Sequence, residues 1–470
     1  MGEIFKHIID EIKFIETLTK TRKVKVLFGN KTPSKTAYFK KLKPKGFILE
    51  MTSSNYWRLN VGDQIKASVL NPSLNLQITD SYVKTIGSSI VGSKQTHGAK
   101  LHVNSFEGKL INDSQKMYYR TVIPIEKGLN FFRIIADEVY AHDGGFSTRG
   151  LLRVTLSSEM FHVFIVDIEK KHYLFVDCLN KITLDNYSEF CWSIMVSLGY
   201  LLGHLPQNEE YTFCYKNKQH KTASNFIYNQ RRDTIKSVYT PINSNPYSWI
   251  KDDREIASKY YDKISEINTK QLSMFCQIVH EEMDIKAIVL LITESISRSL
   301  LLMPAGLSVA LEGLSEYFAI KNEETIKPIK DKKLAKTLRK DLTEILQKYS
   351  KLEGFTGAQI IQNKIDNINT PTNREKLKAP FTILKIPLIE IDEEVLEYRN
   401  DFLHGNINLK PQKGKKTYSM DSFEISLRLL TLLNMAIMKM IGYNGYIINH
   451  VKTQEPGLNK QINEDYYREI

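Results

Sequence analysis

The pattern of apolar residues changes once along this 470-residue chain, at Asn243-Ser244-Asn245-Pro246. Before this tetrapeptide, short apolar or alternating runs are separated by turn-forming residues, which is typical of antiparallel strands. After it, apolar residues recur every three or four positions over long segments, which is typical of packed helices. The sequence therefore predicts an α+β protein, with a β-rich antiparallel N-terminal domain over residues 1–245 and an all-α bundle over residues 246–470.

The first half is predicted to form a sandwich or barrel of short strands. The expected strands are Val24–Phe28, Gly46–Met51, Tyr56–Val61, Ile65–Leu70, Tyr118–Pro124, Asn130–Ile135, Leu151–Leu156, Phe161–Ile168 and Tyr173–Val176. A helix over about Glu3–Leu18 precedes them, and Lys170-Lys171-His172 is expected to form a hairpin turn. A second helix is expected from about Asn186, at a capping-box spacing, to Leu202, with Gly203 ending it.

The second half is predicted to consist of amphipathic helices joined by short connections. The expected helices are Ile250–Ile267, Gln271–Glu281, Ile285–Leu301, Leu307–Ile320, Lys332–Tyr349, Gly357–Ile368, Glu393–Leu403 and Ser422–Ile441. Arg374, Lys376 and Lys378 are expected in a loop before the helix at Glu393–Leu403. The long apolar segment Ile285–Pro304 contains three charged residues, which indicates a buried helix rather than a membrane span.

Composition restricts the partners and the compartment. A net charge of +12 and 25% charged residues indicate a polyanionic partner such as nucleic acid, although a lysine-rich surface also serves solubility. The four cysteines are scattered without a C-x-x-C pair, so a zinc site built on that motif is not expected. No phosphate-loop or dinucleotide glycine pattern appears, and no cofactor is expected. Charged residues interrupt the N-terminal segment from Lys6 onward, so we expect no signal peptide, a cytoplasmic location and no membrane partner.

The residues best suited to chemistry lie late in the chain, at Arg399-Asn400 and His404-Gly405. On a helix from about Glu393, Arg399 falls within the apolar face, while Asn400 and His404 are four residues apart and adjacent. Arginine is a permanent forked cation that suits phosphate, and histidine exchanges a proton near neutral pH. The same spacing also arises by chance, in which case Arg399 pairs with a structural carboxylate and His404 bonds the last carbonyls of its helix.

Arg399-Asn400-x-x-x-His404-Gly405, an amphipathic helix after it, and Gly442-Tyr443-Asn444-Gly445 resemble the C-terminal HEPN domain of prokaryotic defence proteins, ApeA-like anti-phage proteins in particular. The resemblance is most specific over about Asp392–Asn449. Those domains are all-helical bundles with an R-x4-6-H motif, often with a polar residue directly after the arginine. The resemblance implies a metal-independent endoribonuclease of an abortive-infection system, in which the ribose 2′-hydroxyl attacks the adjacent phosphorus.

The resemblance also implies roles and partners. His404 would act as general base or acid, Arg399 would stabilise charge on the phosphate, and Asn400 would orient His404 or the phosphate. RNA, with transfer RNA as one candidate, would be the substrate. A homodimer through the motif helix would place two motifs in one cleft, and a phage-derived trigger would act at the N-terminal domain. Glu312, on an earlier helix, would orient Arg399 or His404; a solvated acidic stripe with Glu316 is the plainer interpretation.

Basic residues on either side of the motif are candidates for RNA-backbone contacts. They are Lys332, Lys336 and Arg339 on one predicted helix, and Lys410, Lys413, Lys415 and Lys416 after the motif. The alternative is a solubilising surface. Two rival functions also stay open. One is a non-catalytic HEPN module that binds RNA or forms a scaffold, and the other is a nucleotide-transferring HEPN protein, which needs a nucleotide and magnesium.

Overall fold

The computed structural model describes residues 3–28, 36–53, 59–71, 74–91, 94–108, 115–127, 129–143, 148–251, 253–297, 299–403 and 420–470. For residues 3–4, 74, 91, 94 and 398–403 it describes the backbone alone. The chain divides into two compact units. The first comprises residues 1–244 and 266–281, and the second comprises residues 245–265 and 282–470. A single cut between residues 245 and 246 would assign residues 266–281 to the second unit, whereas their contacts assign them to the first.

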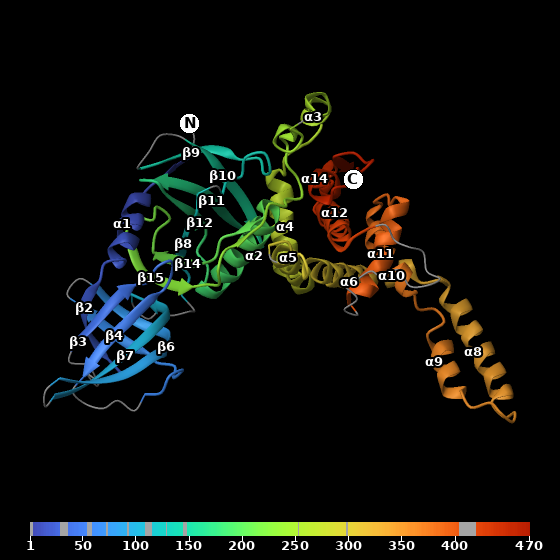
Figure 1. The fold of residues 1–470 in the computed structure, drawn as a ribbon, viewed down its shortest axis with the longest axis horizontal. Coiled ribbons are helices and arrows are strands. Elements are labelled where there is room, and N and C mark those ends of the chain that lie inside the picture. The colour runs from blue at the N-terminus through green and yellow to red at the C-terminus, as the bar shows by residue number, and fades with distance from the viewer. Residues whose placement is uncertain are drawn as a thin grey trace. The chain divides into compact units, whose positions relative to one another are not determined.

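The first unit is built on one large sheet, shown in Figure 1. Its strands are β1 (Glu3–Phe5), β2 (Arg22–Leu27), β3 (Thr36–Lys41), β4 (Phe47–Ser53), β5 (Ala67–Asn71), β6 (Leu74–Val91), β7 (Lys94–Glu107), β8 (Tyr118–Ile125), β9 (Glu138–His142), β10 (Thr148–Leu156), β11 (Glu159–Ile168), β12 (Lys171–Cys178), β14 (Glu209–Tyr215) and β15 (Ala223–Gln230). The pairings are antiparallel except for β1 with β9. Two short strands, β13 (His204–Leu205) and β16 (Ile235–Lys236), pair separately.

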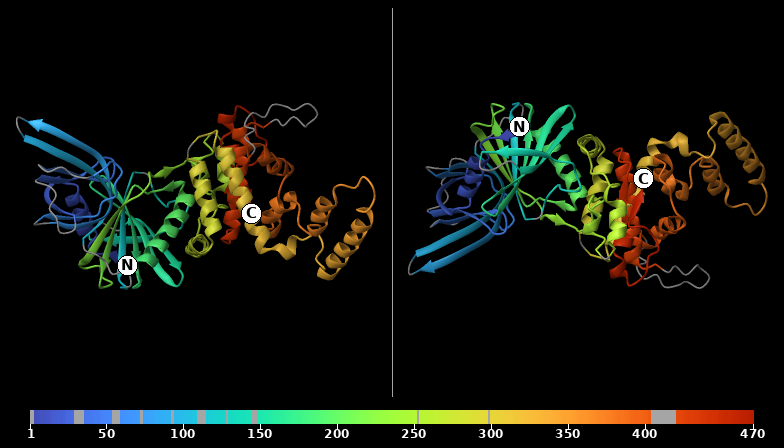
Figure 2. Two further views of the ribbon diagram at one scale, coloured as in Figure 1. Left: turned by 90° about the horizontal axis from the view of Figure 1, so that it is seen from below. Right: turned by 90° about the horizontal axis from the view of Figure 1, so that it is seen from above.

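Part of this sheet closes on itself. β7 pairs with β4 and also with β6, so the order β7-β4-β3-β2-β5-β6 returns to its start as a six-stranded barrel. Within the described residues, each of these six strands therefore pairs with a neighbour on both sides. The remaining strands form an open sheet that joins the barrel where β15 pairs with β7. β6 and β7 continue past the barrel as a two-stranded ribbon, light blue in Figure 2, in which residues 84–90 are exposed. The antiparallel β-rich region expected from the sequence is confirmed.

Two predicted strands are wrong in their described parts. Residues 130–135 form a turn, in which Arg133 has φ 67° and only Ile135 makes a bridge, to Ile267. A positive φ at a non-glycine residue does not fit an extended strand. Residues 59–61 are not a strand either, and residues 54–58 lie outside the described residues. By contrast, the predicted hairpin turn is present one residue earlier, at Glu169 and Lys170, which have φ values of 49° and 67°, as a type I′ turn requires.

Three helices pack on the first unit: α1 (Ile8–Leu18), α2 (Leu184–Leu202) and α4 (Thr269–Glu281). α2 starts two residues earlier than expected, because the Thr183 side chain caps it by accepting from the Asn186 amide at 3.4 Å. Gly203 ends it with φ 63°, as predicted. α4 lies against β10, where the Ser273 hydroxyl accepts from the Thr155 amide at 3.0 Å.

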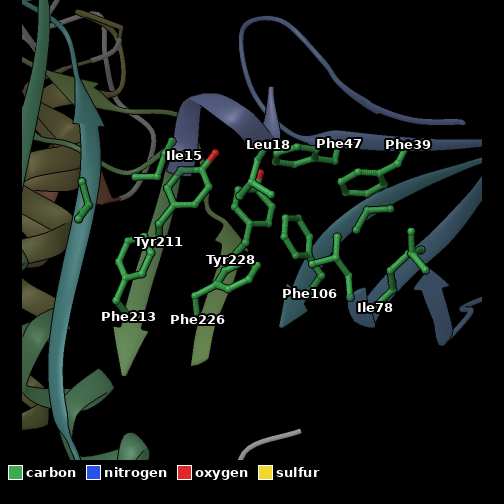
Figure 3. Packing of buried hydrophobic residues seen from close by; sticks show 14 of the residues in the cluster. Ile15, Leu18, Phe39, Phe47, Ile78, Phe106, Tyr211, Phe213, Phe226 and Tyr228 are labelled. Atoms are coloured by element: carbon green, nitrogen blue, oxygen red, sulfur yellow. The ribbon is translucent and has the colours of Figure 1, made fainter. Parts of the chain in front are cut away.

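An aromatic core joins the barrel to the open sheet, as Figure 3 shows. The rings of Phe39 and Phe47 stack with centroids 5.0 Å apart, and those of Phe106 and Tyr228 stack at 4.7 Å. Phe47 meets Tyr228 edge-on at 4.8 Å. Each of these four rings is inaccessible to solvent, so the barrel and the open sheet share one hydrophobic core and form a single unit.

A buried charge cluster links α1 to the sheet. The guanidinium of Arg120, 1% exposed, donates to both oxygens of Asp177 at 2.7 Å and to both oxygens of Glu11 at 3.0 and 3.1 Å. Burial alone would raise the pKa of Asp177, but Arg120 holds it below its usual value. Burial raises the pKa of Glu11 to about 7, even beside Arg120. Buried hydrogen bonds from Arg120 of β8 therefore hold both Glu11 of α1 and Asp177 of β12.

The second unit is mainly helical. Its helices are α3 (Arg254–Tyr261), α5 (Met283–Ser295), α6 (Met303–Lys321), α7 (Glu323–Ile326), α8 (Lys332–Tyr349), α9 (Ala358–Asp366), α10 (Asn373–Leu384), α11 (Glu390–Leu403), α12 (Ser422–Met440), α13 (His450–Thr453) and α14 (Glu455–Leu458), with a 3-10 turn at Pro246–Ser248. α6 packs against α5, α10, α11 and α12. Every residue of α12 from Glu424 to Met438 is buried, so α12 is the core helix of the unit.

The sequence predicts most of these helices but not all of the unit. The expected helix at Ile250–Ile267 is a helix only over Arg254–Tyr261. α10 occupies a stretch that was expected to be a loop. Two strands, β17 (Tyr446–Ile448) and β18 (Tyr467–Glu469), pair antiparallel. The sequence predicted an all-α unit. The core of the second unit is α-helical, but the unit also contains this strand pair.

Candidate functional site

The helix that carries the predicted motif is α11, three residues longer at its start than expected. In the first turn of this helix, the Asp392 carboxylate accepts from the Ile389 amide, just before the helix, at 3.0 Å. Val395 and Leu396 are buried, at 0% and 3% exposure, so the predicted apolar face does pack into the unit. Arg399 and Asn400 lie in the last turns of this helix. The backbone of the motif is therefore helical up to Leu403.

The motif side chains themselves lie beyond what the structure describes. For Arg399 and Asn400 only the helical backbone is described, and His404 lies outside the described residues. The same holds for Lys410, Lys413, Lys415 and Lys416. The predicted chemistry needs the Arg399 guanidinium and the His404 imidazole to lie close together, and this stays a prediction.

A buried ion pair anchors the start of α11. Arg468, on β18, donates from both Nη1 and Nη2 to the carboxylate of Asp392, each at 2.8 Å. Asp392 is 1% exposed. A two-pronged pair of this kind sets the orientation of the two groups as well as their separation. This ion pair therefore ties β18 to the first turn of α11.

Glu312, the predicted orienting carboxylate, is exposed on α6, a helix that packs against α11. Glu316, one turn further along the same helix, accepts from the Lys376 ammonium of α10 at 3.1 Å. The structure thus brings the helix of Glu312 together with the motif helix. Its side chain is solvent-exposed, as the plainer interpretation of an acidic stripe also requires.

The basic residues of α8 lie on another part of the unit. Lys332, Lys336 and Arg339 are exposed, and Lys332 approaches Glu324 at 3.4 Å. α8 packs along α9, and Figure 1 draws this helical pair beside neither α6 nor α11. Within the described residues these three cations are therefore not gathered around the motif helix.

Cations that do approach the motif helix come from α10, where a loop was predicted. Lys378 meets Glu393 at 2.7 Å, while Arg374 lies 3.4 Å from Glu393 and 3.3 Å from Glu397. Lys378 holds the pKa of Glu393 below its usual value. These side chains border a pocket of about 340 Å³ between α10 and α11, floored by the apolar Leu377 and Leu396. On α11 the residues that line the pocket end at Glu397, two positions before Arg399.

A sequence signal for α10 was present. Thr372 and Glu375 form a complete capping box, in which each side chain accepts from the other residue's amide. This is the S/T-x-x-E pattern that marks a helix start. Pro380 lies inside this helix. Because proline usually ends a helix, it made the stretch resemble a loop in the sequence.

Another histidine of the unit is structural. His450 is 1% exposed, and its Nε2 lies 3.1 Å from the Asn434 amide nitrogen of α12. Burial lowers the pKa of His450 to about 3. This imidazole is neutral near pH 7, so it is unsuited to exchanging protons with a substrate there.

Two features of the described residues concern metal ions and membranes. Within the described part of the chain, no group of three or more His, Cys, Asp or Glu side chains is arranged to hold a metal ion. Among the described helices, none combines the length and apolar character needed to cross a bilayer.

Comparisons with known proteins identify no family for this chain. No family model matches the chain, and no curated protein matches it. Among solved structures, a crystal structure of K. pneumonia MrkH is 10% identical and MrkH in its apo state is 11% identical. Each alignment covers 37% of this chain and 83% of MrkH, with a TM-score of 0.14. A likeness at this level assigns neither a fold nor a function, and no family membership is shown.

Proposed function

We propose that the second unit is a metal-independent endoribonuclease of the HEPN type, serving an anti-phage, abortive-infection system. The observation that carries the proposal is the Arg399-Asn400-x-x-x-His404 motif at the end of a helix. Support comes from the buried face of α11 and from its anchoring through Asp392 and Arg468. Catalytic groups need such a rigid supporting helix, because small displacements of a reacting group cost much of the rate.

In the proposed reaction, His404 takes the proton of the ribose 2′-hydroxyl, or protonates the leaving oxygen. The 2′-oxygen forms a bond to the adjacent phosphorus while the bond to the 5′-oxygen breaks, which leaves a cyclic phosphate and a free 5′-hydroxyl. Arg399 stabilises the charge that develops on the phosphate. Asn400 orients His404, and Glu312, on the helix packed against α11, positions Arg399.

A second proton-transfer group is needed, because one histidine cannot remove and donate a proton in the same step. A homodimer through the motif helix would supply it from a second copy of His404. In this proposal RNA backbone is held by Lys332, Lys336 and Arg339, by Lys410, Lys413, Lys415 and Lys416, and by Arg374 and Lys378 of α10. The last two are paired with Glu393 and Glu397, so phosphate would compete with these carboxylates.

The test is RNA cleavage by the purified protein, with total RNA and transfer RNA, with and without a chelator. His404→Ala is expected to lower the cleavage rate at least about 100-fold, the usual contribution of general acid–base catalysis. His97→Ala, in the first unit, is the matched control and should cleave at the wild-type rate. Thermal melts of both variants would verify that the fold is kept.

Three outcomes would contradict the proposal. Cleavage that persists in His404→Ala excludes the assigned histidine. Binding of RNA without cleavage by the wild type favours a non-catalytic module or scaffold. Activity that needs a nucleotide and is abolished by the chelator favours a nucleotide-transferring protein.

A further inference from the structure

One helix of the second unit, α8, exposes several large apolar side chains. It packs against α9, as Figure 1 shows, and its two buried residues, Ala335 and Leu346, lie on one side of it. Leu334, Ile345 and Tyr349 are nevertheless 58%, 52% and 49% exposed. Apolar side chains that are exposed together on one surface usually mark a place where another molecule binds.

These exposed residues follow a line along the helix. At about 100° per residue, Leu334, Leu338, Ile345 and Tyr349 fall within about 60° of one another, over a length of about 22 Å. Leu338 is half-buried, and Leu352, in the turn after the helix, is exposed and continues the line. These five residues are called the apolar stripe below.

The cations of α8 that are assigned to RNA lie on another side of the helix. Lys332, Lys336 and Arg339 fall about 80° or more beyond the edge of the apolar stripe. At its opposite edge lie one carboxylate and one ammonium, those of Asp341 and Lys348, and both residues are exposed. A surface that combines apolar side chains with one charge of each sign fits a protein better than it fits a polyanion.

The apolar stripe and its two charges match an inverted copy of themselves. Leu338, Ile345 and Leu352 are spaced seven residues apart, and Asp341 and Lys348 lie between them, also seven apart. In an antiparallel pair of α8 helices centred on Ile345, Leu338 of one copy lies opposite Leu352 of the other. The same pairing brings Asp341 within one position of Lys348 of the other copy. A parallel pair would instead place like charges together, which is unfavourable.

We propose that α8 pairs antiparallel with α8 of a second copy of this chain, along the apolar stripe and about a two-fold axis beside Ile345. A two-fold contact uses the same surface on both partners, and this explains why the pattern of the apolar stripe is the same in both directions. The contact is separate from the dimer proposed through the motif helix, and it holds whether or not the protein cleaves RNA.

The test is the mass of the full-length protein in solution, measured by sedimentation equilibrium. The wild type is expected to associate through α8 with a Kd on the order of 10 µM, because a contact of one helix per chain is smaller than a standard interface. Ile345→Glu places two carboxylates at the axis and should weaken this association at least about 10-fold. The matched control is Ile360→Glu on α9, at a 65% exposed isoleucine outside the apolar stripe, which should associate as the wild type does.

Exchange of the two charges tests the direction of the pair. Asp341→Lys alone, or Lys348→Asp alone, sets like charges opposite each other twice and should weaken association about 5-fold. The double variant restores two opposite-charge pairs and should associate as the wild type does. A parallel pair, or an unrelated surface, would show no such restoration, and that result would contradict the proposal.

Thermal melts accompany each variant. Should Ile345→Glu fail to fold, the exchange of charges still decides the question, because Asp341 and Lys348 are exposed. A wild type that stays monomeric at about 100 µM, ten times the expected Kd, would overturn the proposal. Association that Ile345→Glu leaves unchanged would also overturn it, since the motif helix or another surface would then hold the copies together. His404→Ala should associate through α8 even if it no longer cleaves RNA.

Discussion

At the scale of single residues, Arg120 shows how a buried charge is tolerated. Both oxygens of Asp177 and both oxygens of Glu11 accept from it. Its partners lie 57 and 109 positions away in the sequence, so no local pattern could have revealed the cluster. Sequence reasoning finds neighbours on one helix or strand, whereas this cluster exists only after α1, β8 and β12 have met.

Removing one member of this cluster should be far more damaging than removing a surface pair. Asp177→Asn leaves the Arg120 guanidinium buried without its main counter-charge, and we expect a loss of about 3–5 kcal/mol in the free energy of unfolding. Glu138→Gln, which breaks the exposed pair with Arg153, should cost about 1 kcal/mol or less. Urea denaturation of the two variants measures both values, and equal losses would contradict this account.

Glu11 should make the stability of the first unit depend on pH. Its pKa is raised from 4.5 to about 7, so between these values the folded state binds more protons than the unfolded state. Stability from this group is therefore greatest below about pH 4.5 and falls as pH rises toward 7, by on the order of 3 kcal/mol. Urea denaturation at pH 5 and pH 8 should show this slope in the wild type and lose it in Glu11→Gln. Glu16→Gln, on the same helix, should keep it.

At the scale of elements, the end of α2 illustrates which glycines are needed. Gly203 has φ 63°, and a Cβ there would lie 2.7 Å from the Tyr239 carbonyl oxygen. Gly442, after α12, has φ 75° but nothing within 4 Å of such a Cβ. Gly203→Ala should therefore cost about 2–4 kcal/mol and Gly442→Ala about 1 kcal/mol, the left-handed backbone alone. Denaturant titration of both variants tests the difference, and similar costs would show that crowding is unimportant.

The elements that sequence reasoning found and missed differ for physical reasons. β8, β11 and β12 are central strands with long apolar runs, so their pattern predicts them. The ribbon of β6 and β7 was missed, because residues 84–90 are exposed and include glycine and serine rather than a buried face. α10 was missed because of Pro380. The motif helix was predicted correctly. The catalytic role of Arg399 and His404 depends on side chains that the structure does not describe, so it stays a prediction.

At the scale of the whole molecule, the division into two units does not follow a single point in the sequence. α4 belongs to the first unit, although residues 245–265 before it belong to the second. A helical pattern shows that α4 is a helix but cannot show which core it joins. Its buried side chains decide that, and they include Phe275 and Val279, at 1% and 0% exposure.

Fragments test this division. A fragment of residues 1–281 retains α4 over β10 and α2, whereas a fragment ending at residue 245 exposes the apolar surface that α4 covers. The shorter fragment should melt about 10 °C or more below the longer one, or aggregate. Met274→Ala in the longer fragment, at a 41% exposed position of α4, is the control and should leave its melting temperature nearly unchanged. Equal melting of the two fragments would contradict the assignment of α4.

Because α4 belongs to the first unit while the residues before and after it belong to the second, the two units should respond unusually to cleavage of the backbone. The chain passes between the units at residues 244–245, 265–266 and 281–282. A protease that severs only the first of these peptide connections leaves α4 embedded in the first unit and still continuous with the second. The nicked halves would therefore migrate together until α4 dissociates, whereas two domains joined by one linker would part after a single cut.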